Sequence, residues 1–151
     1  MVNIQRSKFN VDHDASKRTF NGIIFDSVME MKFYRDVILP QVESGQILYY
    51  ELQKPYELQP KFTYNGKPVR AIIYVADFYV EYSDGRIIVF DTKGAADSIA
   101  KCKRKLFWYK YPDINYQWIT YVKKYGGWID WDKAAKMRKD EKKKKKELEE
   151  S

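Results

Sequence analysis

Cysteine and histidine are nearly absent from this sequence of 151 residues, which holds one of each, Cys102 and His13. A single cysteine excludes a disulfide framework and a cysteine-rich zinc site. A reducing, intracellular setting is therefore the default expectation. A catalytic site that needs a histidine base would have to use His13, which stands in a polar N-terminal segment, and we do not expect one there.

Long hydrophobic runs are missing as well. No apolar stretch approaches the ~20 residues that span a bilayer, and the first residues, Met1 to Arg6, lack the apolar core of a signal peptide. We therefore expect a cytoplasmic protein with no membrane partner. The Gly-x-x-x-x-Gly-Lys loop that cradles nucleotide phosphates is also absent, so no nucleotide cofactor is expected.

What the sequence does contain indicates a folded, sheet-containing domain. Apolar residues make up 44% of the chain and aromatic residues 17%, a composition that excludes a disordered protein. The formal net charge is +7, of which the nine basic and five acidic residues of segment 133–151 account for +4. Because the remainder is only +3, overall charge is a weak argument for a polyanionic partner.

The helical signals follow a short N-terminal part. Residues 1–18 are polar and predict a loosely held arm, and an Asn-Gly pair within 19–25 predicts a small hairpin. Ser27 is a good N-cap, and Glu30 stands at the capping-box spacing. The helix that begins there is expected to end at Gly45. It is expected to break or restart at Pro40.

Strand-like runs and turn signals alternate through the middle of the chain. They predict an antiparallel meander, and its longest run is apolar on both faces, as a central strand should be. A helix over 97–110 follows, and its apolar stripe should face the core. A last strand is expected over 116–122. The predicted strands before that helix cover 47–52, 56–64, 69–82 and 86–93, and the stripe comprises Ile99, Cys102, Leu106 and Tyr109.

This order of elements predicts an α/β fold, a mixed β-sheet flanked by helices in a single domain. We place that domain at residues 19–132. The segment 133–151, which contains the lysine run 142–146, is expected to be a frayed, charged helix or disordered.

The stretch Val-Phe-Asp-Thr-Lys-Gly at 89–94 ends an apolar strand with Asp91 and Lys93 on the same face, because strand side chains alternate. The preceding strand contains Asp77. If Ser83–Gly85 is a three-residue loop, Asp77 lies directly opposite Asp91. A two-residue loop would put the two carboxylates on opposite faces, so the register is a hypothesis.

Two carboxylates facing each other destabilise a sheet unless something neutralises them. A divalent cation such as Mg²⁺ removes the conflict, and a lysine beside it suits phosphate chemistry, where it orients water and offsets negative charge. The competing interpretation is that Asp91 caps a turn and Lys93 is a solvated edge residue. The combination with Asp77 favours the metal site.

The pattern Asp77, hairpin, Asp91-x-Lys93 resembles the signature of the PD-(D/E)XK nuclease superfamily, which has the restriction-endonuclease-like fold, although Ala76 replaces the usual proline. Within that superfamily, the sequence resembles a group of small phage-encoded nucleases, over roughly residues 19–122. It also rests on the strings Phe25-Asp26-Ser27-x-x-Glu30, Glu57-Leu58-Gln59-Pro60-Lys61-Phe62, Tyr74-Val75-Ala76-Asp77-Phe78, Asp91-x-Lys93-Gly94 and Lys103-Arg104-Lys105-Leu106-Phe107.

The resemblance implies a Mg²⁺-dependent DNA phosphodiesterase, with Mn²⁺ able to substitute. Asp77 and Asp91 would bind the metal and Lys93 would be catalytic. Glu30 would assist at the metal or simply cap its helix, and both roles stay open. Holliday junction resolvases are prominent among small phage members, so we expect an endonuclease that cuts branched recombination intermediates as a homodimer, in the bacterial host's cytoplasm if phage-encoded.

Other tasks fit the same scaffold. A nickase, a transposase-like end-cleaving enzyme and an exonuclease are the nearest alternatives, and a non-catalytic DNA-binding protein is the more distant one. DNA contacts are expected from a basic stripe on the helix after the site and from the neighbouring strand, where Gln59 could instead bond Asp77. The candidate nucleic-acid-binding residues are Gln59, Lys61, Lys101, Arg104 and Lys105.

Overall fold

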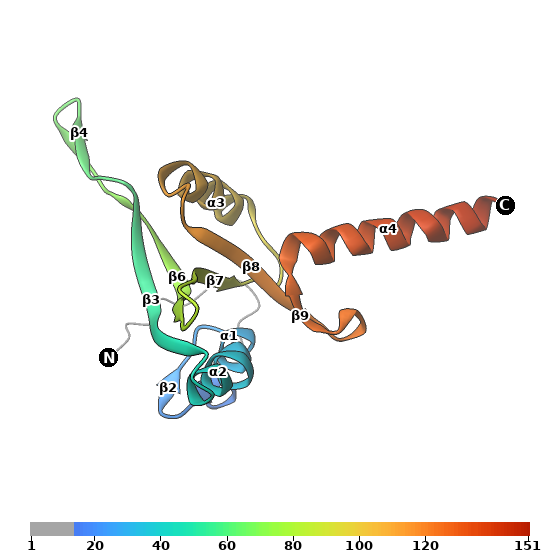
Figure 1. Ribbon diagram of the computed structural model, residues 1–151. Coiled ribbons are helices and arrows are strands. Elements are labelled where there is room, and N and C mark those ends of the chain that lie inside the picture. The colour runs from blue at the N-terminus through green and yellow to red at the C-terminus, as the bar shows by residue number, and fades with distance from the viewer. Residues whose placement is uncertain (1–13) are drawn as a thin grey trace.

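The computed structural model describes residues 14–151 (Figure 1). It is a single α/β domain around a five-stranded mixed sheet, as the sequence predicts. The sheet order is β3-β6-β7-β8-β9, in which β7 and β8 are parallel and the other neighbours are antiparallel. Its strands are β3 (Ile47–Gln59), β6 (Ile72–Tyr82), β7 (Ile87–Thr92), β8 (Asn115–Val122) and β9 (Gly127–Asp130).

Helices and two small hairpins surround this sheet. The hairpins are β1 (Thr19–Phe20) with β2 (Ile23–Ile24) and β4 (Phe62–Tyr64) with β5 (Lys67–Val69). The helices are α1 (Val28–Phe33), α2 (Leu39–Glu43), α3 (Ser98–Lys110) and α4 (Trp131–Glu150), with 3-10 turns at Ala15–Arg18 and Lys123–Tyr125 and a π-helical segment at Tyr34–Ile38.

Two apolar clusters hold helices on opposite faces of the sheet. Phe33 of α1 lies in one cluster with Phe90 of β7, and their ring centroids are 5.3 Å apart. Phe107 of α3 lies in the other cluster with Val89, the neighbour of Phe90. Because adjacent strand residues point to opposite faces, α1 and α3 cover different sides of β7. The site described below lies where this strand ends.

The N-terminal helix passes through Pro40 without a break. Proline cannot donate to the carbonyl four residues earlier, and the π-helical segment Tyr34–Ile38 precedes it, with Leu39 N–H bonded to Tyr34 O five residues back. A π segment widens the helix locally, which accommodates the proline ring. The predicted end is confirmed, since Gly45 follows the last turn with φ +80°.

Strand β3 differs from its prediction because it is continuous from Ile47 to Gln59, where two strands with a gap at 53–55 were expected. Pro55 does not interrupt it, since β3 is an edge strand and needs hydrogen bonds on one side only. β6 is central, as predicted. The strand β9 was not predicted from the sequence.

The predicted core face of α3 is wrong except at Leu106, which packs against the second cluster. Ile99 is 65% and Tyr109 88% exposed, and Cys102 is also exposed. The fully buried residue is Phe107, which was assigned to neither face. Lys103 is partly buried one turn before it, because a long basic side chain can lay its aliphatic stem along apolar surface.

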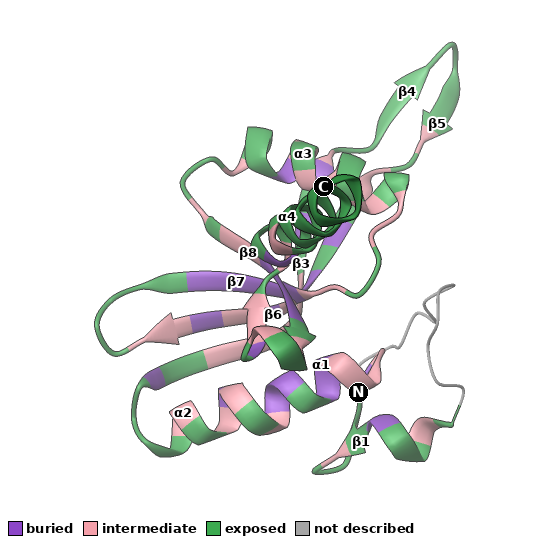
Figure 2. Cartoon of the chain, turned by 90° about the vertical axis from the view of Figure 1, so that its right-hand side faces the viewer, coloured by how far each residue is buried: buried purple, intermediate pink, exposed green. Residues whose placement is uncertain are grey.

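The C-terminal segment is an extended helix rather than a disordered tail. Asp130 caps α4 by accepting a hydrogen bond from Lys133 N–H at 2.9 Å, so the expected boundary at 132/133 falls within its first turn. Figure 2 shows α4 as largely exposed. Most of the predicted arm 1–18, with His13, lies outside the described residues. Within residues 14–151 no helix is long and apolar enough to cross a membrane.

Candidate metal and phosphodiester site

The β6–β7 hairpin has the three-residue loop on which the site prediction depended. Tyr82 N–H donates to Arg86 O at 2.9 Å, and Gly85 has φ +91°. The register runs from Glu81 opposite Ile87 to Phe78 opposite Phe90. The three-residue loop and this register are as predicted. Asp77 and Asp91 are the next residues after the last pair, and no ladder pair joins them.

Asp77 is held by the residue that follows Asp91. Thr92 donates both its backbone N–H, at 2.9 Å, and its hydroxyl, at 3.0 Å, to Asp77 Oδ2. Burial raises the pKa of Asp77 well above its ordinary range, the charges of Asp91 and Glu30 raise it further, and the Thr92 N–H partly opposes them. This carboxylate is thus fixed in place by hydrogen bonds but electrostatically unfavourable when charged.

Asp91 and Lys93 form an ion pair on the same face of the strand. Asp91 is 3% exposed, and Lys93 Nζ lies 2.6 Å from its Oδ2. Apart from this pair, Oδ2 accepts no hydrogen bond from the residues described. Burial lowers the pKa of Lys93, but the adjacent Asp91 outweighs it, and the net pKa is raised. Lys93 is therefore an ammonium group at neutral pH.

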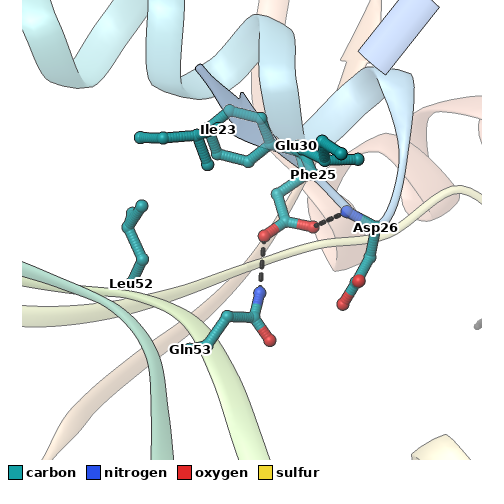
Figure 3. Close-up of a pocket in the computed structure, with 7 residues that line it drawn as sticks. Ile23, Phe25, Asp26, Glu30, Leu52 and Gln53 are labelled. Carbon is teal, nitrogen blue, oxygen red and sulfur yellow. Dashed lines mark hydrogen bonds between the residues drawn. The ribbon is translucent and has the colours of Figure 1, made fainter. Parts of the chain in front are cut away.

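Glu30 caps its helix only in part. Its backbone N–H donates to Ser27 Oγ at 3.0 Å, as an N-cap requires. Its carboxylate reaches back to Asp26 N–H at 3.2 Å and accepts from Gln53 Nε2 at 2.6 Å (Figure 3). In a capping box that carboxylate would bond the N–H of the cap residue itself. Glu30 instead points toward the sheet, where Asp91 lies close enough to affect its charge.

The environment of Glu30 favours the protonated acid. The side chain is 2% exposed. Burial, followed by the charges of Asp26 and Asp91, raises its pKa to about 8, against the lowering effect of the Gln53 and Asp26 hydrogen bonds. A carboxyl group with such a pKa marks either a strained structural position or a functional site.

Gln53, which sequence reasoning missed, has an unusual backbone. Its φ is +56° in the middle of β3, a left-handed conformation that is costly for a residue other than glycine and concentrates at functional sites. The neighbouring pairs Leu52–Phe78 and Lys54–Ala76 place it across from Asp77. No sequence pattern predicts a positive φ at a glutamine within a strand.

Near Gln53 and Asp77, the side chains of β3 and β6 pass from one apolar cluster of the fold to the other. On β6, Phe78 packs with α1, whereas Ala76, two residues earlier, packs with α3. On β3, Leu52 and Tyr56 are divided in the same way. The change of cluster thus falls at the level of Gln53, whose φ is positive, and of Asp77, the residue between Ala76 and Phe78.

Asp26 is the other residue that the prediction omitted, although it stands in the quoted string around Glu30. It is partly buried, and burial raises its pKa while Arg18 lowers it. Its charge also contributes to the raised pKa of Glu30. Asp26, Glu30, Asp77 and Asp91 therefore form one interacting acidic group next to Lys93.

The donor set of this acidic group fits Mg²⁺. Oxygen donors from carboxylates are what Mg²⁺ binds at enzyme sites. Among residues 14–151, the buried Asp91 Oδ2 is paired with the Lys93 ammonium. Within those residues, however, no three acidic, histidine or cysteine side chains are arranged so that they could hold a metal ion. The two oxygens of Glu30 accept hydrogen bonds from Asp26 N–H and Gln53 Nε2.

The predicted DNA-binding residues are separated by the fold. Lys101 and Lys105 are exposed on α3. Arg104 is instead part of a structural contact. Its guanidinium lies 3.9 Å from the centre of the Trp118 ring and pairs with Asp132 of α4 at 2.9 Å.

The two strand residues also lie away from the acids. Gln59 pairs with Ile72, five residues along β6 from Asp77, so the hydrogen bond considered between Gln59 and Asp77 is not formed. Gln53 occupies the position opposite Asp77 instead. Lys61 lies beyond the end of β3, exposed at the base of the β4–β5 hairpin.

The C-terminal end of β7 is fixed from two sides. Lys93 N–H donates to Ile119 O of β8 at 2.8 Å. Trp131, at the start of α4, donates its indole N–H to Gly94 O at 2.9 Å. The backbone that carries Lys93 is therefore tied both to the sheet and to the C-terminal helix.

Comparison with known proteins gives a family but no activity. No curated protein matches the chain. Residues 6–127 match the family described as "Protein of unknown function (DUF1064)". Because this match covers most of the 151 residues, the chain belongs to the DUF1064 family.

Proposed function

We propose that this protein is a Mg²⁺-dependent nuclease that hydrolyses DNA phosphodiester bonds. The observation that carries the proposal is the meeting of three side chains just past the last hairpin pair, Phe78–Phe90. Lys93 Nζ lies 2.6 Å from Asp91 Oδ2, and Asp77, which Asp91 influences electrostatically, accepts two hydrogen bonds from Thr92. Buried carboxylates of like charge are costly without a cation, and an ammonium group beside them is suited to a phosphate substrate.

Asp77 and Asp91 would hold the metal, with Glu30 joining them directly or through water. Mn²⁺ is expected to substitute, because it accepts the same oxygen ligands. When bound, Mg²⁺ would polarise the phosphoryl group and lower the pKa of a coordinated water. Thr92 keeps Asp77 in position through its two hydrogen bonds.

Lys93 acts as a donor in this proposal. Its raised pKa keeps it protonated near neutral pH, so it orients the attacking water and stabilises the negative charge that develops on the phosphoryl oxygens. It does not remove the proton from water while it is paired with Asp91. The ion pair positions the ammonium group before substrate binds.

The substrate that we propose is branched DNA, cut by an endonucleolytic, resolvase-like homodimer in the cytoplasm. The support for a DNA substrate is the pair of exposed lysines, Lys101 and Lys105, on the helix that follows the site. The branched substrate and the dimer rest on the resemblance to small phage nucleases.

The test is cleavage of labelled linear duplex, single-stranded and four-way-junction DNA in Mg²⁺ or EDTA. We expect Asp91→Asn and Lys93→Ala each to lower the rate by roughly 10²-fold or more, as loss of a catalytic electrostatic contact does. Asp84→Asn is the matched control, because it removes an exposed carboxylate from the same hairpin.

Three results would decide between the alternatives. Absence of metal-dependent cleavage of all three substrates by the wild type would overturn the nuclease. Equal cutting of duplex and junction would remove the resolvase assignment and keep the nuclease. Sedimentation as a monomer on the junction would remove the homodimer.

A further inference from the structure

The β4–β5 hairpin projects from the sheet as a separate arm (Figure 1). Two residues, Asn65 and Gly66, connect its strands, with φ of +48° and +72°. Positive φ at both positions is the type I′ turn that suits a tight hairpin. All residues of the arm from Lys61 to Pro68 are exposed (Figure 2). Nothing within residues 14–151 buries either of its faces.

The arm is basic without any compensating acid. No aspartate or glutamate occurs between Glu57 and Asp77, whereas Lys61, Lys67 and Arg70 lie in that interval. Aromatic rings accompany them, since Phe62 and Tyr64 are 46% and 67% exposed. Cations and exposed rings on one hairpin are suited to phosphates and to the sugar and base edges of nucleic acid.

The base of the arm is fastened to α3. Tyr111, directly after that helix, donates its hydroxyl to Glu57 O at 2.8 Å. Lys103 Nζ donates to Ile73 O at 3.3 Å. Glu57 and Ile73 pair with each other on β3 and β6, so both strands that lead into the arm are held by the same helix. The strands from which the arm projects are thus held in place by α3 and Tyr111.

The arm begins on the strand that carries Asp77. Asn65 and Gly66, at its tip, are 11 to 12 residues from Asp77 along the chain, which corresponds to at most about 36–40 Å at ~3.3 Å per strand residue. One turn of B-form DNA is ~34 Å long, and its major groove admits a two-stranded ribbon. The tip of the arm can therefore reach duplex DNA up to about one turn from the acidic site.

We propose that the β4–β5 arm binds duplex DNA within about one helical turn of the phosphate that is cut, with Lys61, Lys67 and Arg70 on the backbone phosphates. This inference rests on the proposed function for its substrate. It adds the substrate form, because a duplex repeats its backbone and grooves every ~34 Å, a fixed spacing that a flexible single strand does not have. It also gives a function to the exposed aromatic residues Phe62 and Tyr64.

The test measures DNA binding in EDTA, where cleavage does not interfere. The variant combines Lys61→Ala, Lys67→Ala and Arg70→Ala, and fluorescence anisotropy follows duplexes of 10 and 20 base pairs over a range of NaCl. We expect the slope of log Kd against log[NaCl] to fall by about 2 to 3, because each lost phosphate contact removes ~0.9. This loss of phosphate contacts should be seen with the 20-base-pair duplex and not with the 10-base-pair duplex.

The matched control is the triple variant Lys142→Ala, Lys143→Ala and Lys144→Ala, which removes the same charge from α4. Any effect of this control should be equal for both duplex lengths. A shortened chain in which an Asn-Gly turn replaces residues 60–71 should behave as the arm variant does. Circular dichroism would confirm that each variant is folded.

The outcomes for the arm and for the nuclease are separate. If the arm variant binds the longer duplex with unchanged Kd, the proposal that the arm binds DNA is overturned, even if the wild type cleaves DNA. A change in oligomeric state without a change in Kd would overturn it too, since the arm would then be a subunit interface. Length-dependent loss of binding together with absent cleavage would support the arm and overturn the nuclease.

Discussion

Glu30→Gln should change how the stability of the fold depends on pH. The folded-state pKa of Glu30 is about 8, against a model-peptide value of 4.5, so between these values the folded protein binds a proton that the unfolded chain has released. Stability is then highest below pH 4.5 and is lost as the pH rises toward 8. Glutamine keeps the shape of the side chain and cannot be charged.

The magnitude follows from one proton. Between pH 5.5 and 7.0 the free energy of unfolding falls by about 1.4 kcal/mol per pH unit for each proton bound only in the folded state, so Glu30 contributes a fall of about 2 kcal/mol. Asp77, whose pKa is also raised, adds to the slope in the wild type. Glu30→Gln should therefore reduce the slope without abolishing it.

The assay is urea unfolding in EDTA, followed by tryptophan fluorescence at several pH values. Glu43→Gln, at an exposed position on the neighbouring helix α2, is the control and should keep the wild-type slope. Adding Mg²⁺ should raise wild-type stability above pH 7, because a cation relieves the repulsion among the carboxylates. Equal slopes for Glu30→Gln and wild type would refute the argument, as would stability that rises with pH over this range.

Two further predictions concern residues that support the site. Thr92→Val removes the hydroxyl bond to Asp77 and should cost about 1 kcal/mol of unfolding free energy in the same assay, while Thr92→Ser should keep it; equal stability of the two variants would contradict this assignment. Arg104→Lys should destabilise the fold by roughly 1–2 kcal/mol, because lysine cannot both stack on Trp118 and pair through a planar fork. The Kd of this variant for DNA should be unchanged. If it loses as much DNA affinity as Lys105→Ala does, Arg104 is a DNA contact after all.

The part of the site that could be predicted depends on local turn chemistry. Ser83-Asp84-Gly85 can form a three-residue loop because Gly85 accepts a positive φ, and that loop alone fixes which residue of β6 lies opposite Asp91. The Asn-Gly turns at 21–22 and 65–66 were predictable for the same reason, and both positions have positive φ in each.

The parts that could not be predicted depend on contacts distant in sequence. Gln53, whose φ is positive, donates its side-chain amide to Glu30, which is 23 residues away in the sequence. On α3 the apolar stripe indicated the wrong face, because aliphatic stems of basic side chains and Phe107 fill the space next to the sheet. The gap predicted at 53–55 is absent because β3 is an edge strand, in which Pro55 is tolerated.

The indole bond from Trp131 to Gly94 has a practical consequence for anyone who shortens this protein. The family match ends at residue 127, and a chain cut there would lose both Trp131 and Asp132, the partner of Arg104. The peptide after Lys93 would then be free to move. A minimal protein that retains the geometry of the lysine should therefore extend at least past Ala134, which is fully buried.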